Sequence, residues 1–309
     1  MKRFILKRLL ETVIVIYLCL TAVFFMVRLS GDPVLLMVPV DASQEFITEF
    51  RHEMGFDDPL IVQYGKFVLA AVRGDFGKSV RQQVSASKIV FERIPASLLL
   101  TITSILISLI IAIPLGVYSA IERGRPVDMI CTVSSVFAVS IPNFWLGLML
   151  ILFFSVFLRW LPTGGMGGLK HLVLPSITLG AYSAARIMRI TRSSMIDMLN
   201  MDYVRTARAK GLSEKKVIWK HALKNAMVPI ITITGLQIGV IFGGALITET
   251  IFAWPGLGRL IVQSISFRDY PIVQVSIFVT AVMFCLTNLV VDILYAITNP
   301  EIRYEKSGA

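Results

Sequence analysis

The sequence has few charged residues, few cysteines and few histidines for its length. Asp, Glu, Lys and Arg make up 16% of the 309 residues, whereas 55% are hydrophobic. This balance excludes an ordinary soluble domain and predicts a membrane protein with several spans. The 3 cysteines and 3 histidines show no metal-ligand spacing, so we expect neither a disulfide framework nor a metal site. The cysteines all fall inside apolar runs, at Cys19, Cys131 and Cys285.

The chain also lacks the motifs of nucleotide binding and of catalysis within a membrane. RGDFGKS at 73–79 is similar to a phosphate-binding loop, but Val72 occupies the position where that loop needs its first glycine. We therefore expect a turn there. An intramembrane protease needs a Ser/His pair, two aspartates or H-E-x-x-H, and no histidine lies well inside an apolar run. We expect no catalytic residue, no cofactor bound by this chain and no nucleic-acid partner.

Long apolar stretches dominate what remains. A membrane span needs about 20 apolar residues, and six candidates occur in the chain. They are residues 9–27, 94–121, 129–158, 172–185, 225–248 and 270–297. The fourth is the shortest, because its uncharged run stops before Arg186. The sequence therefore predicts an all-α polytopic membrane protein with six transmembrane helices.

Basic residues are distributed unevenly between the loops. If Met1 is inside, the inner loops carry nearly all of the net charge of +10 and the outer segments are almost neutral. The positive-inside rule then places both termini in the cytoplasm. We expect a first span within 1–29, an external segment at 30–93, a five-helix core at 94–297 and a cytoplasmic tail at 298–309.

Polar and small residues within the expected spans each have two interpretations. IPNFWLG at 141–147 interrupts the third span, either as a structural kink or as pore lining that includes Asn143. Gly235, Gly239 and Gly243 form a small-residue stripe that allows close helix packing, either within the chain or against a second membrane subunit.

One acidic residue, Asp292, lies within the sixth expected span. It either pairs with a basic residue of the inner face or takes part in transport. An ion-coupled secondary transporter would carry more ionisable residues in its spans and an internal repeat, and neither is evident here.

A basic segment follows the fourth expected span and reads RTARAKGLSEKKVIWKHALKNAMVPI from 205 to 230. Gly211 is a helix stop, Ser213 is a good N-cap, and Glu214 suits the first turn of a second helix. A short helix is expected over 214–222. Its apolar face holds the side chains of Val217, Ile218, His221 and Ala222. Such a helix either lies on anionic lipid or docks into a soluble partner.

Nearly the whole chain resembles the permease subunits of ABC importers, in their dipeptide/oligopeptide/nickel branch. Eleven stretches match in order, and the basic segment resembles the EAA loop of that family. The stretches are GDP at 31–33, DDPLIVQY at 57–64, GDFGKS at 74–79, PNFWLG at 142–147, WLPTGG at 160–165, LPSITLG at 174–180, DYVRTARAKGL at 202–212, HALKNAMVP at 221–229, FAWPGLGR at 252–259, RDYP at 268–271 and NLVVDILY at 288–295.

Within the EAA pattern, Ala207 and Gly211 match, whereas Arg205, Thr206 and Lys224 replace its glutamate, first alanine and final proline. The resemblance implies a type I importer fold in the inner membrane, with a cytoplasmic coupling helix within 202–229. It implies a second, similar permease, two ATPase subunits that use ATP and Mg, and an external substrate-binding protein as partners.

The resemblance also implies roles for particular residues. The residues expected to couple to the ATPases are Ala207, Arg208, Lys210, Gly211, Leu212, Glu214, Lys215, Val217, Ile218, His221 and Ala222. Those expected to contact the binding protein or form the outer gate are Trp254, Pro255, Gly256, Arg259, Arg268 and Asp269. Those expected along the translocation path are Asn143, Phe144, Trp145 and Glu249.

The solute is expected to be peptide-like, since no cluster of metal-ligand residues is evident. A di- or oligopeptide is the first expectation. Nickel, an opine-type metallophore and glutathione remain alternatives, because much of the selectivity in this family resides in the binding protein.

Overall fold

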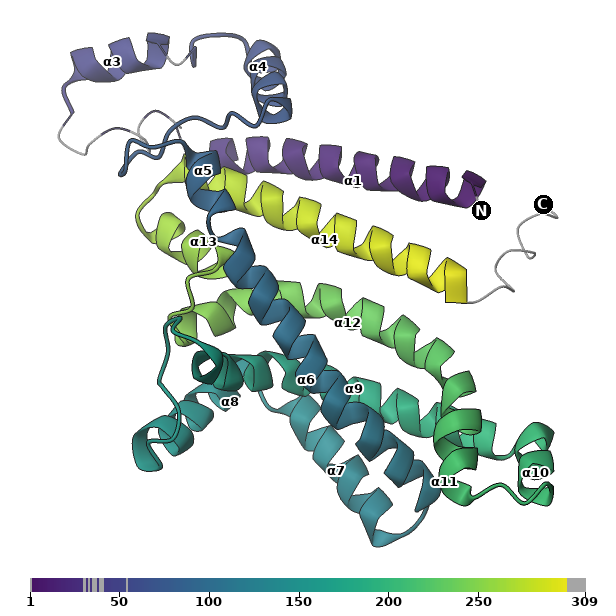
Figure 1. Ribbon diagram of the computed structural model, residues 1–309. Helices are drawn as coiled ribbons and strands as arrows, with labels where there is room; N and C mark the ends of the chain where they lie inside the picture. Colours follow the sequence, from purple (N-terminus) through teal and green to yellow (C-terminus); the bar gives the residue numbers. More distant parts are fainter. Residues whose placement is uncertain are drawn as a thin grey trace. The chain divides into compact units, whose positions relative to one another are not determined.

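The computed structural model describes residues 2–29, 32, 34, 38, 42–53 and 55–298, and this described part is almost entirely helical (Figure 1). It divides into two compact units. The larger unit contains Leu98–Trp254 and residues 287–298, and the smaller unit contains Arg3–Ser97 and Pro255–Leu286. The described residues contain no β-strand, only an isolated bridge between Lys78 and Ser85.

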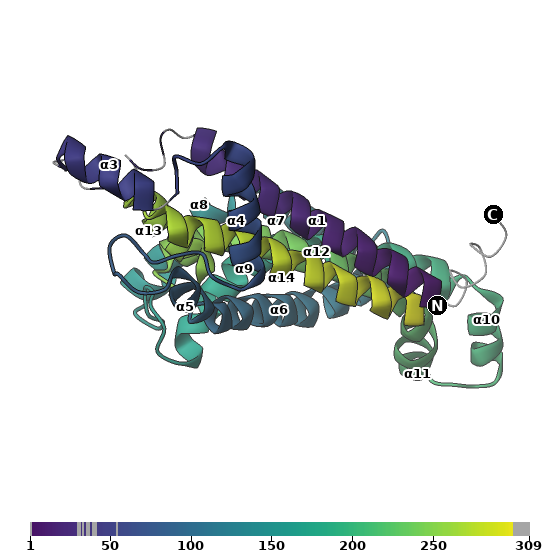
Figure 2. The ribbon, with the colours of Figure 1, turned by 90° about the horizontal axis from the view of Figure 1, so that it is seen from above.

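The larger unit is built around two long helices, α9 (Leu169–Leu199) and α12 (Leu223–Ile251), which lie side by side in Figures 1 and 2. Ser183 of α9 donates a hydrogen bond to the Gln237 side chain of α12 at 3.2 Å, and both are buried. A buried polar pair of this kind satisfies both groups and sets the register of the two helices. The other helices of this unit are most of α6 (Ile94–Ile121), α7 (Pro126–Ser140), α8 (Asn143–Leu150), η1 (Ile151–Phe157), α10 (Asp202–Ala209), α11 (Glu214–Lys216), η2 (Val217–Ala222) and the end of α14 (Tyr270–Thr298).

The smaller unit has its own apolar core. It contains α1 (Lys2–Leu29), α3 (Gln44–Glu53), α4 (Leu60–Val72), α5 (Ala86–Phe91), α13 (Leu257–Ser266) and the first part of α14. Its core is formed by Ala86, Ile89 and Val90 of α5 with Leu257 and Leu260 of α13 and Ile272, Val275 and Val279 of α14. The apolar residues of α5 recur at helical spacing, so this short helix buries one face against two others.

The six expected spans correspond to α1, α6, the α7–η1 stretch, α9, α12 and α14, which confirms the all-α class. Within the described part, four helical stretches are long and apolar enough to cross a membrane, or five if the bent α7–η1 pair counts as one. The exception is α9, whose second half carries Arg186, Arg189 and Arg192. The helix of the fourth span runs on through these arginines without a break.

The third span is not a straight helix. The α7 helix ends at Ser140, α8 begins at Asn143, and the two halves meet at 105°. Pro142 causes the break, because proline provides no backbone N–H and restricts the residue before it to extended conformations. The expected interruption is therefore present as a kink, and the third span consists of the helices α7, α8 and η1.

Two smaller expectations concern the loops and the last span. The 73–79 stretch is a turn, with Gly74 and Gly77 at φ +75° and +83°, as expected. Asp292 lies within α14, but its side chain is outside the described residues, as are residues 299–309 of the expected tail. The expected division into 1–29, 30–93, 94–297 and 298–309 stays a prediction.

Candidate functional site

The basic segment, residues 202–229, contains two short helices separated by Gly211. The first is α10, and the second consists of α11 followed directly by η2. Gly211 has φ +75°, and its N–H donates to the Arg208 carbonyl at 2.9 Å. Only glycine reaches this left-handed conformation without a steric penalty, which is why the first helix ends here. Figure 1 shows the resulting hairpin of α10 and α11.

An ion pair bridges the glycine break. The Arg208 guanidinium donates to Glu214 at 2.8 and 3.4 Å, with the two side chains 44% and 61% exposed. At this exposure the pair stabilises the hairpin by less than about 1 kcal/mol. Ser213 occupies the N-cap position, as expected, but its hydroxyl makes no capping hydrogen bond. Instead its carbonyl accepts the N–H groups of Lys216 and Val217.

Burial divides the predicted coupling residues into two groups. The small and apolar residues Ala207, Val217 and Ala222 are buried within the chain. Leu212, Ile218 and His221 are half-buried. The exposed residues are Arg208, Lys210, Gly211, Glu214 and Lys215. The segment is thus anchored by its apolar face and presents its charged face outward.

The second helix is continuous with the fifth expected span. A π-helical turn over Val217–Ala222 leads straight into α12, so the helical backbone runs from Glu214 to Ile251. The expected helix over 214–222 and the expected span over 225–248 are both helical, but they form one continuous stretch instead of two separate helices. No glycine or proline lies between Ser213 and Pro229 to end the helix, and the π-turn accommodates one extra residue.

The described contacts also bring several of the matched stretches together around Phe252, which is 1% exposed. The Gly165 N–H of WLPTGG donates to the Phe252 carbonyl at 2.7 Å. A Cβ at Gly164 would lie 2.3 Å from that carbonyl oxygen, and one at Gly147 of PNFWLG would lie 3.2 Å from the Phe252 ring. Glycine is therefore required at Gly164. Phe252 was absent from the predicted site residues, although its place at the start of FAWPGLGR marked it.

Asp269 of RDYP joins another pair of matched stretches. It is 3% exposed and accepts the Ser79 hydroxyl of GDFGKS at 2.5 Å and the Val80 N–H at 3.3 Å. This carboxylate therefore holds the loop after GDFGKS against the start of α14. Of the other residues expected to contact a binding protein, Trp254 and Gly256 are buried, Pro255 and Arg259 are half-buried, and Arg268 is exposed.

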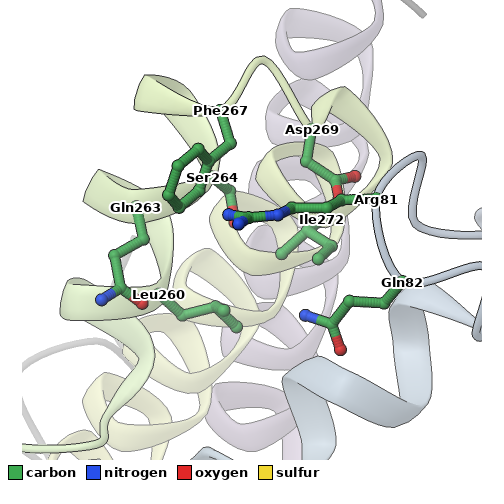
Figure 3. Close-up of a pocket in the computed structure, with 8 residues that line it drawn as sticks. All are labelled: Arg81, Gln82, Leu260, Gln263, Ser264, Phe267, Asp269 and Ile272. Atoms are coloured by element: carbon green, nitrogen blue, oxygen red, sulfur yellow. The ribbon is translucent and has the colours of Figure 1, made fainter.

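A cavity of about 200 Å³ lies beside Asp269 in the smaller unit. The Arg81 guanidinium lies over the Phe267 ring, 4.0 Å from its centroid, and Figure 3 shows the side chain extending across the cavity toward that ring. Stacking of this kind orients a guanidinium while its edge keeps hydrogen-bond donors. The lining residues are Arg81, Gln82, Leu260, Gln263, Ser264, Phe267, Asp269 and Ile272.

The predicted path residues differ in their surroundings. Phe144 and Trp145 of α8 are exposed, Asn143 is half-buried, and Glu249 of α12 is fully buried. The Asn143 amide nitrogen lies 3.8 Å from the position of a Cβ at Gly244 of α12. Asn143 therefore lies at the helix bend next to α12. Among the residues that the structure describes, no group of three His, Cys, Asp or Glu is arranged to hold a metal ion.

The glycine stripe of α12 is divided between two environments. A Cβ at Gly235 would lie 2.1 Å from a methyl group of Val291 in α14, so this glycine permits a close contact within the chain. Gly239 is buried, whereas Gly243 is exposed and a Cβ there would meet no atom within 4 Å. Intrachain packing thus accounts for Gly235, and Gly243 remains open to another subunit.

Two family models match the chain. The model of the binding-protein-dependent transport system inner membrane component covers residues 112–304, and that of its N-terminal region covers residues 1–101. Together they span both compact units.

Curated relatives match almost end to end. The glutathione transport system permease protein GsiC of Salmonella paratyphi A (strain ATCC 9150 / SARB42) is 42% identical over 306 residues, which is 99% of this chain and 100% of that protein. GsiC of Escherichia coli (strain K12) is 43% identical with the same coverage.

Solved structures support the fold. Two crystal forms of the inward-facing MetNI methionine ABC transporter match with TM-scores of 0.56 and 0.55, each at 18% identity, covering 68% of this chain and 96% of that one. At this identity the likeness concerns the fold alone. The family models and the full-length relatives show that the chain belongs to the binding-protein-dependent transport system inner membrane components, the multi-pass inner-membrane permease subunits of ABC importers.

Proposed function

We propose that this chain forms one half of the translocation path of an importer for a peptide-like solute. The observation that carries the proposal is the 42–43% identity to glutathione permeases over 99% of the chain. Glutathione is itself a tripeptide, so these relatives favour a small peptide over a bare metal ion. A second, similar permease would supply the other half of the path, and Gly243 of α12 offers it an open surface for close helix packing.

The basic segment is the proposed contact with one of the two ATPase subunits, which would use ATP and Mg. Its apolar residues, Ala207, Val217 and Ala222, are buried and hold the hairpin in place. Its exposed side chains, including Lys210 and Lys215, suit an acidic partner surface. In this proposal both chain termini and the basic segment lie in the cytoplasm, as the distribution of positive charge favours.

The smaller unit is proposed to receive the binding protein. Arg268 and the stacked guanidinium of Arg81 are exposed and basic, and they suit carboxylates on that partner. Trp254, Gly256 and Asp269 are buried, so they would support the contact by holding the loops that carry it. Pro255 and Arg259 are half-buried.

The translocation path is proposed to include Asn143, Phe144 and Trp145 of α8. The first of these lies at the 105° bend, next to α12. Non-helical backbone at membrane depth is tolerated where it is buried in protein or lines a watery path. Glu249 is fully buried, and it would meet the solute only if the surrounding helices separate during transport.

The first experiment is to purify the tagged chain from detergent-solubilised membranes of its host. We expect a second permease and P-loop ATPase subunits in the eluate, together with ATPase activity. The accompanying binding protein is then titrated with glutathione, with a dialanine peptide and with Ni²⁺. Binding of either peptide supports the proposed solute, whereas binding of Ni²⁺ alone overturns it. A well-folded chain that reproducibly carries no ATPase overturns the proposed assembly.

A further inference from the structure

The carboxylate of Asp128, in the first turn of α7, accepts four hydrogen bonds. Its Oδ1 accepts from the Ser119 hydroxyl and from Arg192 Nε, both at 2.6 Å. Its Oδ2 accepts from the Gly124 N–H at 2.9 Å and from an Arg192 terminal nitrogen at 2.7 Å. Asp128 is 6% exposed. A single buried side chain thus joins the end of α6, the α6–α7 turn, the start of α7 and the middle of α9.

The depth and geometry of this contact separate it from ordinary surface ion pairs. The Arg192–Asp128 pair is bidentate, and its side chains are 28% and 8% exposed. Charge-assisted bidentate pairs are both stronger and more directional than single contacts. The same turn also holds the pair Arg125–Glu122, with side chains 72% and 34% exposed. Such an exposed pair contributes little, which makes it a natural internal control.

The helix that ends at this turn also contacts the basic segment. The Tyr118 ring of α6 packs edge-on against Trp219 of η2, with centroids 6.4 Å apart at 72°. Two residues earlier, Gly116 lies so close to α9 that a Cβ there would be 2.6 Å from Thr191. The inner end of α6 therefore touches the element that precedes the basic segment, α9, and the one within it, η2.

From this geometry we propose that Asp128 is a positioning residue for coupling between the ATPases and the transport path. The inference rests on the proposed function of the basic segment. Movement of that segment would displace α6 through the Trp219–Tyr118 contact. The bonds from Asp128 to Ser119, Gly124 and Arg192 make α6, α7 and α9 follow as one body. Without these bonds, α6 would shift against α9, and the movement of the basic segment would not reach the transport path.

The test uses the complete complex in proteoliposomes with its binding protein and labelled glutathione. The readout is the amount of solute transported per ATP hydrolysed. Asp128→Asn keeps the shape of the side chain but removes its charge, and we expect this ratio to fall by about tenfold or more, as for loss of a charge-assisted hydrogen-bond pair. Arg192→Lys and Ser119→Ala remove fewer of the bonds, so we expect smaller decreases. Glu122→Gln, which breaks the exposed pair of the same turn, should leave the ratio unchanged.

A second measurement does not depend on the solute. Spin labels at Glu122→Cys and Met198→Cys, in a background without the three native cysteines, report the distance between the α6–α7 turn and the end of α9. We expect this distance to be the same with and without ATP in the otherwise unchanged complex, and to vary with ATP once Asp128→Asn is added.

Three results would overturn the proposal. The first is a normal transport ratio in Asp128→Asn. The second is an ATP-dependent change of the label distance while Asp128 is intact. The third is a combination of two results: the Asp128→Asn complex loses its ATPase subunits, and Ser119→Ala transports the normal amount of solute per ATP. Together these results would show that the carboxylate has a purely structural role. Failure of the proposed function is distinguishable, because the complex with Asp128 intact would then lack ATPase subunits or ATP-dependent uptake.

Discussion

At the scale of single residues, Gly211 is the position whose identity the backbone dictates most strictly within the basic segment. Its φ of +75° excludes proline, whose ring holds φ near about −65°. A Cβ at Gly211 would meet no atom within 4 Å. The cost of a substitution therefore comes from the backbone alone, and for an ordinary residue it is about 1–2 kcal/mol.

Gly211→Pro should uncouple ATP hydrolysis from uptake while leaving the chain inserted in the membrane. The substitution prevents the reversal of the chain between α10 and α11 and so displaces the exposed charged face. We expect uptake to fall by about tenfold or more, measured in proteoliposomes beside the ATPase rate. Gly211→Asn is the matched control, since asparagine tolerates the left-handed region, and it should retain most of the uptake. Normal uptake by the proline variant would contradict the coupling role of this hairpin.

The sequence predicted this glycine break but not the partners of the charged residues around it. The end of a helix at a left-handed residue is a local feature, so the glycine itself is enough to predict it. The pairing of Arg208 with Glu214, by contrast, depends on how the chain turns back at Gly211. For the same reason the bonds of Asp128 to Arg192, 64 positions away in the chain, could not be read from residue types.

At the scale of helices, α12 offers two glycines with opposite surroundings. Gly235→Ala should destabilise the chain by about 1–3 kcal/mol, because the new methyl group would overlap Val291. Val291→Ala in the same chain should restore most of this loss by making room. The thermal unfolding of the purified chain measures both effects. An equally stable Gly235→Ala variant would show that α12 and α14 separate freely at this point.

Gly243→Ala tests the open end of the stripe. A Cβ there meets no atom of the described residues within 4 Å, and alanine is the better helix former by about 1 kcal/mol. The isolated chain should therefore be as stable as before or slightly more stable. If a second permease packs against this face, co-purification of that subunit should decrease. Unchanged recovery would place the subunit contact elsewhere on the chain.

Helix positions were predicted well, whereas helix directions were not. The apolar run at 94–121 coincides with α6, because an uncharged run of that length is sufficient to define a span. The 105° angle of the bend after Ser140 and the π-turn that joins η2 to α12 were not predicted, although Pro142 did indicate a kink. Apolar length carries no information about either. The shortness of the fourth apolar run did correctly identify α9 as the least hydrophobic of the six.

At the scale of the whole molecule, the order of many weak motifs along the chain indicates the family. Contacts in the structure explain why some of these motifs need particular residues. GDFGKS and RDYP are joined by the Ser79–Asp269 hydrogen bond, and WLPTGG and FAWPGLGR meet at Phe252. Each stretch alone reads as a turn. Their contacts explain why glycine and short polar residues are needed at particular positions, which the sequence could not show without the fold.

The orientation of the chain is the remaining whole-molecule prediction, and the scarcity of cysteine makes it directly testable. The three native cysteines lie within helices and can be replaced without removing a disulfide. Lys88 of α5 and Lys216 of α11 are both exposed, so each can carry a single reporter cysteine.

In right-side-out membrane vesicles, a membrane-impermeant maleimide should label Lys88→Cys and spare Lys216→Cys. Inside-out vesicles should give the reverse pattern, because the basic segment is expected on the cytoplasmic side. The opposite result in both preparations would place the basic segment outside the cell, where no ATPase could reach it, and would overturn the coupling proposal together with the orientation.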